Sequence, residues 1–549
     1  MAIILPTSAR HWTAVALVAA MAAGLAAQSR PTGPSRFNQD HFAHIDQVVL
    51  EALKDRALPG AVVVVGDSRG VVYEKAFGQR AIEPVPEPMT LDTVFDLASL
   101  TKVVATTTAV MQLVESGRLG FSDPVARYIP EFAKYDKGRV TIAQLMTHTS
   151  GLRPDLDLSI EWQGRDEAIR LASEEVLTAS PGSRFVYSDI NFFLLGHIVE
   201  RVSGQTLEQF VKQRVFEPLR MRDTQFTPPA SLRTRIAPTQ WCTPLGWPCT
   251  GSNLVMLRGV VHDPTARRMG GVAGHAGLFS TATDLSRFAR LLLNAGTLDG
   301  TVVLSPLAVR RMTTPVTVGD PPNVRGLGWD IDSTFSSNRG ELMTAGSFGH
   351  TGFTGTSLWI DPTLDVFVVF LSNRVHPSGM GDVTLLRGRV ASIAAGALRD
   401  VPRAAAMVPG PLTSASRTTV SVKPPEPVQA GIDVLRHDGY KLLAGKRVGL
   451  VTNQTGRALD GSSTIDLLHE APGVSLVALF SPEHGIRGTE DALVESSRDE
   501  RTGLVVHSLY GRTRRPTDAM LDGIDTLVID IQDIGVRFYT YVTTMAYVL

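Results

Sequence analysis

The sequence has no surplus of either charge. Its 549 residues include 53 Lys and Arg against 54 Asp and Glu, which gives a formal net charge of −1. It contains no basic run and no stripe of interleaved aromatic residues. The electrostatic features that attract nucleic acids or acidic membrane surfaces are therefore missing. We expect no nucleic-acid partner.

Cysteine is almost absent. Cys242 and Cys249 are the only two, and they lie seven residues apart in a segment that also contains proline and glycine. Two cysteines alone make a poor metal site, and we expect neither a metal nor another cofactor. The pair either closes a small disulfide loop in an oxidising compartment or remains as two free thiols in a packed loop.

Long apolar runs are scarce as well. One run, from Thr13 to Ala27, follows Arg10 and His11 and ends on small residues. These features are typical of a secretory signal peptide, whereas a membrane-spanning helix needs about 20 apolar residues. The sequence predicts a signal peptide at 1–27, export to the periplasm or the exterior, and no stable membrane insertion after cleavage. An uncleaved anchor is the alternative.

Residues 401–427 differ in composition from the rest of the chain, because they are rich in proline, serine and threonine. Such a segment cannot bury enough apolar surface to fold, and its prolines keep it extended. We interpret it as a linker between a domain at 38–400 and a second region at 428–549.

These two regions have different strand and helix patterns. In the first, strand-like segments near both ends enclose helical patterns, one of them capped by Thr281, which predicts a mixed α+β fold. In the second, apolar strand-like segments alternate with helical stretches, which is typical of a buried parallel sheet with crossover helices. The predicted strands are 61–65, 71–73, 357–360 and 366–371, then 447–452, 474–480, 504–508 and 526–531.

Ser99 and Lys102 form an S-x-x-K motif where an extended segment meets a helical pattern. On a helix, residues i and i+3 share a face, so the lysine amine lies beside the serine hydroxyl. Serine is a weak nucleophile without an adjacent base. A lysine in a partly dehydrated pocket can have its pKa lowered enough to take the proton. The motif predicts a nucleophilic serine, although its spacing alone is common by chance.

Two further motifs support this prediction. Tyr187 begins a Tyr-Ser-Asp motif that follows a Pro-Gly turn, and His350 begins a His-Thr-Gly motif before the last predicted strand pair of the first region. A phenol beside the lysine can share its proton and pass it to a leaving group. The glycine, Gly352, lets a substrate lie along a sheet edge.

The order and separation of the three motifs resemble those of the serine β-lactamase and penicillin-binding protein superfamily, in particular its class C-like branch, over about residues 40–395. The resemblance implies an antiparallel sheet with flanking helices and a helical subdomain. It implies Ser99 as the acylated nucleophile, Lys102 as its base partner and Tyr187 as general base and acid. The oxyanion hole would be the N–H groups of Ser99 and Phe353. Substrate contacts would come from Asp189, Thr351, Gly352 and Phe353.

Two positions depart from the β-lactamase pattern. His350 stands where β-lactamases usually have lysine, and a neutral histidine holds a substrate carboxylate poorly. If its pKa is ordinary, penicillins should acylate the protein faster at about pH 5.5 than at about pH 7.5. Asp189 stands where an asparagine amide would contact the acyl-amide group of the substrate. Both departures favour an esterase, peptidase or amidase over a β-lactamase.

His262, Asp263 and His275 lie in a glycine-rich segment. Their spacing matches no compact zinc pattern, and the glycines indicate a tight loop near the pocket. We interpret the segment as a loop that shapes the substrate site rather than as a metal site.

Polar residues follow the predicted strands of the second region. Carboxyl ends of parallel strands are where α/β proteins place their sites, and a Glu-His pair in an apolar framework is costly to bury. Four ordinary polar turns are the alternative. The candidates are Asn453 after the first strand, Glu483 and His484 after the second, and Asp530 and Asp533 after the fourth.

The segments around these candidates resemble the exo-β-N-acetylmuramidase family, from about residue 428 to the end of the sequence. The resemblance implies a Rossmann-like α/β domain that removes terminal N-acetylmuramic acid from cell-wall fragments, with Glu483 as the acid. Glycoside hydrolysis generally needs a second carboxylate, and Asp530 and Asp533 are available for it. The sequence stops at Leu549 within an apolar helical pattern, so we expect a truncated domain with half a site.

Both resemblances predict the breakdown of muropeptides outside the cytoplasm. A serine hydrolase would cut a peptide, amide or ester bond, and the second module would release muramic acid. The expected partner is a small-molecule or muropeptide substrate. The alternatives are a generic carboxylesterase or weak β-lactamase and, from another class, a module that binds peptidoglycan fragments without turnover.

Overall fold

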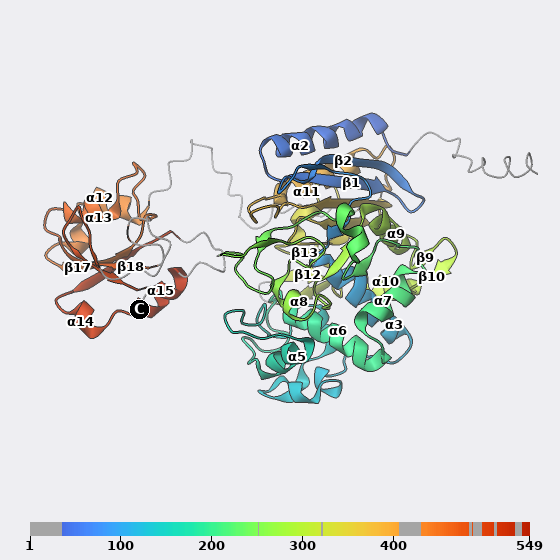
Figure 1. Cartoon of the computed structure of the whole chain (residues 1–549), viewed down its shortest axis with the longest axis horizontal. Helices are drawn as coiled ribbons and strands as arrows, with labels where there is room; N and C mark the ends of the chain where they lie inside the picture. The colour runs from blue at the N-terminus through green and yellow to red at the C-terminus, as the bar shows by residue number, and fades with distance from the viewer. Residues whose placement is uncertain are drawn as a thin grey trace, which may run out of the picture. The chain divides into compact units, whose positions relative to one another are not determined.

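The computed structural model describes residues 36–250, 252–319, 322–403, 405, 430–482, 486, 497–509, 513–532 and 541–548. The predicted signal peptide, and the predicted linker except for 401–403 and 405, lie outside these residues. The chain divides into two compact units, Met1–Ser414 and Ala415–Leu549 (Figure 1). Within the described ranges, no helix is both long and apolar enough to cross a bilayer.

A nine-stranded antiparallel sheet forms the centre of the first unit. Its strand order is β11-β12-β13-β14-β15-β16-β1-β2-β3, so segments from both ends of the unit meet in the middle of the sheet. The predicted α+β fold is therefore confirmed. The strands are β1 (Gly60–Gly66), β2 (Val71–Ala81), β3 (Glu87–Pro88), β11 (Val316–Val318), β12 (Asn323–Arg325), β13 (Asp330–Asp332), β14 (Phe348–Thr351), β15 (Ser357–Asp361) and β16 (Val366–Ser372).

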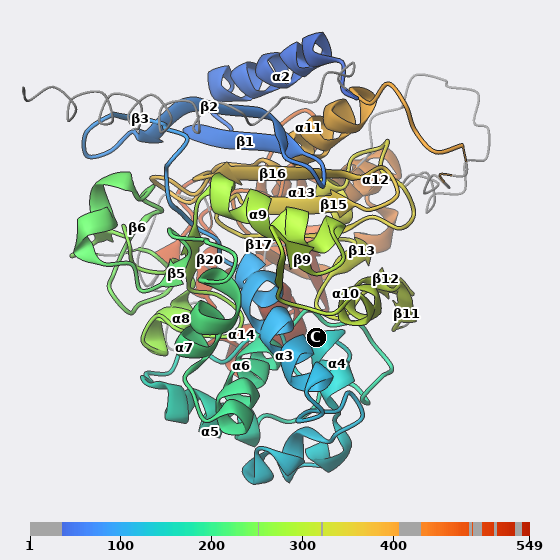
Figure 2. The ribbon, with the colours of Figure 1, turned by 90° about the vertical axis from the view of Figure 1, so that its right-hand side faces the viewer.

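The sheet is buried on both faces at β1 and β16. Successive side chains of a strand point to opposite faces, and those of β1 alternate between two separate apolar cores. Helices α2 (Ala43–Lys54) and α11 (Thr384–Gly396) cover one face, and α9 (Ala282–Leu293) covers the other (Figure 2). This two-sided burial explains why β1 reads as an unbroken apolar run rather than as an alternating one.

The helices around the predicted nucleophile confirm part of the local prediction. The helix expected after Ser99 is present as a π-helical stretch, η2 (Lys102–Thr107), continued by α3 (Thr108–Glu115). The side chain of Thr281 accepts a hydrogen bond from Asp284 N at 3.2 Å and caps α9 as predicted. A helical layer that includes α4 (Ile142–Met146), α5 (Arg165–Glu174) and α6 (Asp189–Ser203) lies beside α3.

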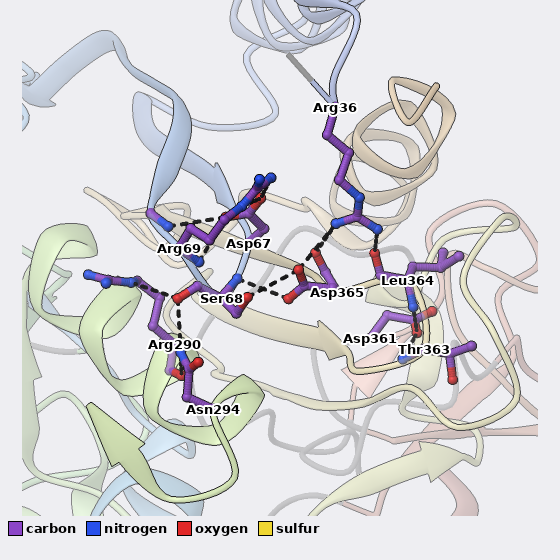
Figure 3. Close-up of polar contacts among 11 residues, drawn as sticks. Arg36, Asp67, Ser68, Arg69, Arg290, Asn294, Asp361, Thr363, Leu364 and Asp365 are labelled. Atoms are coloured by element: carbon purple, nitrogen blue, oxygen red, sulfur yellow. Dashed lines mark hydrogen bonds and ion pairs between the residues drawn. The ribbon is translucent and has the colours of Figure 1, made fainter. Parts of the chain in front are cut away.

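A polar cluster joins the turns at one end of the sheet (Figure 3). The Asp365 carboxylate, in the β15–β16 turn, accepts hydrogen bonds from Ser68 N at 3.0 Å and Ser68 Oγ at 3.1 Å, and pairs with Arg36 at 3.3 Å. Asn294, just after α9, donates to Ser68 O at 2.8 Å. The cluster ties the β1–β2 turn to the β15–β16 turn and to the end of α9.

Cys242 and Cys249 form a disulfide, which decides between the two alternatives that the sequence left open. Arg267 of α8 (Pro264–Arg268) donates to Thr243 O at 3.3 Å and to Gly246 O at 3.2 Å, so the closed loop is fastened to this helix.

Removing this disulfide should destabilise the first unit. For a loop of this length, the chain-entropy relation gives about 2 kcal/mol. We expect the double variant Cys242→Ser/Cys249→Ser to lose about that much free energy of unfolding in a urea titration, and reduction of the wild type to give the same shift. The reductant should leave the variant unaffected. An unchanged midpoint in the variant would show that the loop is held by Arg267 alone.

The second unit is a mostly parallel five-stranded sheet with the order β19-β20-β18-β17-β21. Only the pair β19–β20 is antiparallel, so the predicted parallel sheet is confirmed. Strand order reverses between β17 and β21, which is where sheets of this kind form their ligand crevice. The strands are β17 (Arg447–Thr452), β18 (Ser475–Ser481), β19 (Ser497–Arg498), β20 (Val505–Ser508) and β21 (Thr526–Asp530), with helices α12 (Gly431–His437), α13 (Thr464–His469), α14 (Asp518–Leu521) and α15 (Tyr541–Val548).

Candidate active site

Ser99 lies at a sharp turn between β4 (Phe95–Asp96) and η2. The preceding residue, Ala98, has φ 46°, a left-handed conformation that is rare for a residue with a side chain. Asp96 Oδ1 holds this turn by accepting a hydrogen bond from Ala98 N at 2.9 Å. The turn places the Ser99 hydroxyl beside the first residue of η2, as the spacing of the motif predicted.

Lys102 is fully buried, and its amine has an oxygen partner on three sides. Nζ lies 3.0 Å from Ser99 Oγ, 3.1 Å from His275 O and 2.6 Å from Asp189 Oδ1. A protonated lysine has three N–H donors and no acceptor. The three oxygens therefore match the ammonium form of the side chain.

The charge environment of Lys102 corrects the prediction of a lowered pKa. Burial lowers the pKa of Lys102, but Asp189 and Tyr187 together raise it by more, so the net shift is upward. Asp189 was expected to contact the substrate, yet its carboxylate forms an ion pair with Lys102. The resting site thus contains an ammonium group, which donates to Ser99 and cannot accept the serine proton directly.

Tyr187 is held between two aromatic side chains. Its ring stacks on His148 at a centroid distance of 4.4 Å and contacts Phe335 at 4.9 Å, and Lys102 Nζ lies 4.9 Å from its centroid. Burial raises the pKa of Tyr187, and the charge of Lys102, with hydrogen bonds to Lys102 and Ser99, only partly offsets this effect. The tyrosine is therefore a protonated phenol at neutral pH, placed beside both residues of the S-x-x-K motif.

His148 is a site residue that the sequence analysis missed. It is buried, its Nδ1 accepts a hydrogen bond from Ser188 N at 3.0 Å, and burial, Arg325 and Lys102 hold its pKa well below the usual value. A neutral ring is thus stacked on Tyr187, and the Ser188 contact fixes its orientation. Its only sequence signal is a histidine shortly after α4, which no pattern distinguishes from an ordinary core histidine.

Strand β14 brings the third motif to the nucleophile. A Cβ on Gly352 would lie 2.4 Å from Leu97 O and 2.1 Å from Thr356 Oγ1, so only a glycine allows this strand end to approach residue 97, and its contact with a substrate stays a prediction. Thr351 ends the strand, paired with Ser357 of β15. Within the described part of the chain, the N–H groups of Ser99 and Phe353 donate no backbone hydrogen bond, which leaves both free for an oxyanion.

His350 is buried, and its Nδ1 lies 2.7 Å from Thr351 O. Burial, followed by Arg325 and Lys102, holds the pKa of His350 well below its usual value. The imidazole therefore stays neutral in mildly acidic solution. The predicted acceleration of penicillin acylation at low pH has no titrating group at this position.

We expect the acylation of wild type and His350→Gln by a fluorescent penicillin to depend on pH in the same way between about pH 5.5 and 7.5. Both side chains are neutral in this range, so only the absolute rates should differ. The measurement is the second-order rate constant for labelling of Ser99 at several pH values. Faster labelling of the wild type at the acid end, absent in the glutamine variant, would show that His350 does take up a proton.

His262, Asp263 and His275 lie close to the site. The His262 ring stacks on Phe353 at 5.6 Å, and His275 Nε2 pairs with Asp263 Oδ1 at 2.8 Å. Among the described residues, no group of three or more His, Cys, Asp or Glu side chains is arranged to hold a metal ion. The segment contacts the site through the carbonyl of His275, which accepts a hydrogen bond from Lys102 Nζ at 3.1 Å.

In the second unit, two of the five predicted site residues can be placed. Asn453 follows β17 and Asp530 ends β21, so both lie where the strand order reverses. Asn453 Oδ1 accepts hydrogen bonds from Thr455 N and Thr455 Oγ1, and the Asp530 carboxylate accepts one from Thr464 Oγ1. Glu483, His484 and Asp533 lie outside the described residues.

The fold and the Ser99–Lys102–Tyr187 cluster define a serine hydrolase with a β-lactamase-like domain. The family model for β-lactamase matches residues 45–391, and the chain belongs to this family. A second model, for the N-terminal part of the exo-β-N-acetylmuramidase NamZ, matches residues 448–549. The second unit therefore contains the N-terminal domain of that family.

Curated relatives of the first unit carry names from cell-wall metabolism. A protein of Escherichia coli O157:H7 named "Putative D-alanyl-D-alanine carboxypeptidase" is 31% identical over 376 residues, which is 62% of this chain and 84% of the relative. The N-acetylmuramyl-L-alanine amidase of Bacillus subtilis (strain 168) is 30% identical over 372 residues, 62% of this chain and 83% of the relative. A class C β-lactamase structure has the same fold, with a TM-score of 0.53 and 20% identity over 65% of this chain and 98% of that structure.

Proposed function

We propose that the first unit is a serine amidase that cuts the bond between the lactyl group of N-acetylmuramic acid and its peptide. The observation that carries this proposal is the second unit. A domain of the exo-β-N-acetylmuramidase family in the same chain points to muramic acid as the shared substrate component. The amidase name of the Bacillus subtilis relative supports the same bond.

The neutral His350 favours this bond over two others. A β-lactamase or a carboxypeptidase has to hold a carboxylate beside the bond that it cuts, and a charged donor contributes about 1.5–3 kcal/mol to such a contact. His350 stands where β-lactamases have a lysine, and its lowered pKa leaves it uncharged. The muramyl–peptide bond lies at the other end of the peptide from the terminal carboxylate, so its cleavage needs no cation there.

In the proposed acylation step, Ser99 Oγ attacks the lactyl carbonyl and the N–H groups of Ser99 and Phe353 hold the oxyanion. The serine proton moves to Lys102 Nζ while Lys102 passes one of its own protons to Asp189, 2.6 Å away. Lys102 remains an ammonium group during this exchange and Asp189 becomes a neutral carboxyl, so the negative charge passes from the carboxylate to the oxyanion.

The leaving peptide needs a proton on its nitrogen. The protonated Tyr187 supplies it and regains a proton from Lys102, which in turn recovers one from Asp189. The C–N bond breaks, the free peptide amine leaves, and an ester between the lactyl group and Ser99 remains. Water then hydrolyses this ester by the same route in reverse and releases the muramyl carboxylate with the free serine.

We also propose that the protein acts outside the cytoplasm. The predicted signal peptide at 1–27 supports export, and a disulfide between Cys242 and Cys249 suits an oxidising compartment.

The test is to incubate the full chain with an N-acetylmuramyl pentapeptide that ends in D-alanyl-D-alanine, and to identify the products by mass. We expect N-acetylmuramic acid and the intact pentapeptide, and no products from Ser99→Ala. Loss of the terminal D-alanine with the muramyl amide intact would replace the proposal with a carboxypeptidase activity. Binding of the muropeptide without any product would support the binding module instead.

A further inference from the structure

An ion pair between a fully buried histidine and a partly exposed aspartate lies next to Lys102. His275 Nε2 is 2.8 Å from Asp263 Oδ1, and the His275 side chain is only 1% exposed. Burial lowers the pKa of His275, but Asp263 raises it by more, and His275 in turn lowers the pKa of Asp263 despite its burial. Both shifts favour the charged form of the pair, an imidazolium beside a carboxylate.

One end of this pair touches the catalytic lysine. The backbone carbonyl of His275 is one of the three acceptors of the Lys102 ammonium, at 3.1 Å. The neighbouring carbonyl, of Gly274, accepts a hydrogen bond from Thr106 Oγ1 at 2.7 Å, one turn further along η2. The ring and the carbonyl of His275 belong to one residue, so an ion pair that fixes the ring also limits where the carbonyl can point.

The other end reaches the second partner of Lys102. The Asp263 carboxylate caps α8 by accepting from Ala266 N at 2.8 Å. Thr265 of the same helix donates to both oxygens of Asp155, at 3.0 and 2.9 Å. The residue before Asp155 accepts a hydrogen bond from Asp189 N at 2.7 Å. Two acceptors of the ammonium, His275 O and Asp189 Oδ1, are thus connected through Asp263 and α8.

We propose that Asp263 and His275 are positioning residues for Lys102. Their ion pair holds the His275 carbonyl and, through α8, the segment that carries Asp189, so that the ammonium group points at Ser99. This role goes beyond the proposed amidase reaction, because it applies to attack of Ser99 on any electrophile.

The isosteric change Asp263→Asn tests the geometry. Asparagine keeps the helix cap but removes the ion pair. We expect the rate of phosphonylation of Ser99 by a fluorescent fluorophosphonate to fall about 10- to 100-fold, the usual effect of misplacing a catalytic group by about 1 Å. The matched control is Asp284→Asn. Asp284 is a carboxylate away from Lys102 that accepts from Thr224 Oγ1 and Asp223 N, both at 2.8 Å, and its loss should leave the rate unchanged.

The change His275→Gln tests the ion pair by removing its positive charge while the negative charge of Asp263 remains. In Asp263→Asn the buried His275 sheds its proton, so the local charge is unchanged and the pH profile should keep its position. In His275→Gln the Asp263 carboxylate is left alone, which favours protonation of neighbouring carboxyl groups. The acid limb of the pH profile of the phosphonylation rate should therefore move to higher pH by about one unit. The charged and titratable groups that face the pair are Lys102, Asp96, Asp155, Asp189, His262 and Arg267.

The outcomes separate positioning from a structural role. If the pair acts as a unit, Asp263→Asn/His275→Gln should be no slower than the slower single variant. The proposal is overturned if Asp263→Asn labels within threefold of wild type, or if the profile of His275→Gln does not move. The probe carries no muramyl group, so a failure of the amidase assignment leaves this test intact. The full chain is used throughout.

Discussion

Replacing Ser99 with alanine is expected to lower hydrolysis by about 10⁶-fold, as in serine hydrolases whose residual activity comes from the oxyanion hole and binding alone. The methyl group cannot form an acyl-enzyme, whereas the oxyanion donors at residues 99 and 353 are backbone groups and remain. The measurement is turnover of a p-nitrophenyl ester and of the muramyl pentapeptide, with mass spectrometry of the protein after each. No added mass should appear on the variant.

The same variant should keep its fold. Ser99 Oγ accepts a hydrogen bond from Lys102 Nζ at 3.0 Å and is also hydrogen-bonded with Tyr187, and the loss of a hydrogen bond of this kind costs about 1–3 kcal/mol. A matched control is Ser286→Ala in α9, whose hydroxyl donates to Thr283 O at 2.7 Å. This control should retain full turnover. Hydrolysis by Ser99→Ala that survives repurification would assign the nucleophile to another residue.

Lys102→Met is expected to lower turnover by about 10³- to 10⁴-fold, at the upper end of the effect of a placed acid or base, because the proton route between Ser99 and Asp189 is cut. It should also destabilise the first unit by about 3 kcal/mol, since breaking a buried ion pair leaves one charge unpaired. This value is at the low end of the usual range of about 3–5 kcal/mol for breaking a buried ion pair, because the Asp189 side chain is 22% exposed. Urea titration gives the stability, and ester turnover gives the rate.

A second variant separates these two effects. Lys102→Met/Asp189→Asn removes both charges of the pair, so most of the lost stability should return while turnover stays at the level of Lys102→Met. If the double variant is no more stable than the single one, Asp189 is not held by Lys102 and the ion pair contributes nothing to the fold. Recovery of turnover would show that Asp189 inhibits rather than assists the reaction.

Some of this site was predictable because it depends on spacing within one element. The i, i+3 relation of Ser99 and Lys102 places the two groups together wherever the helix lies. The predicted antiparallel strands on either side of Asp361 also depend only on neighbouring sequence, and the structure has them at 357–361 and 366–372. In the second unit, apolar runs of strand length sufficed to predict the parallel sheet.

The rest depends on contacts between distant segments. The sequence shows Asp189 in place of an amide, but only the packing of α6 against η2 turns its carboxylate toward Lys102. The third acceptor of the Lys102 ammonium is the backbone carbonyl of His275. Every residue type has such a carbonyl, so the sequence cannot indicate its role. The neutral state of His350 depends on burial and on Arg325, which no pattern around residue 350 reveals.

The pairing of β1 with β16 affects how the first unit comes into being. Ala61 lies opposite Ser372. Strand β1 therefore cannot pair with β16 until some three hundred further residues have been synthesised. Contacts this distant in sequence slow folding. A chain that emerges from its N-terminus has Ser99 long before it has residue 353, whose N–H completes the oxyanion hole. The predicted oxyanion hole is therefore incomplete in a nascent chain until almost the whole unit has been synthesised.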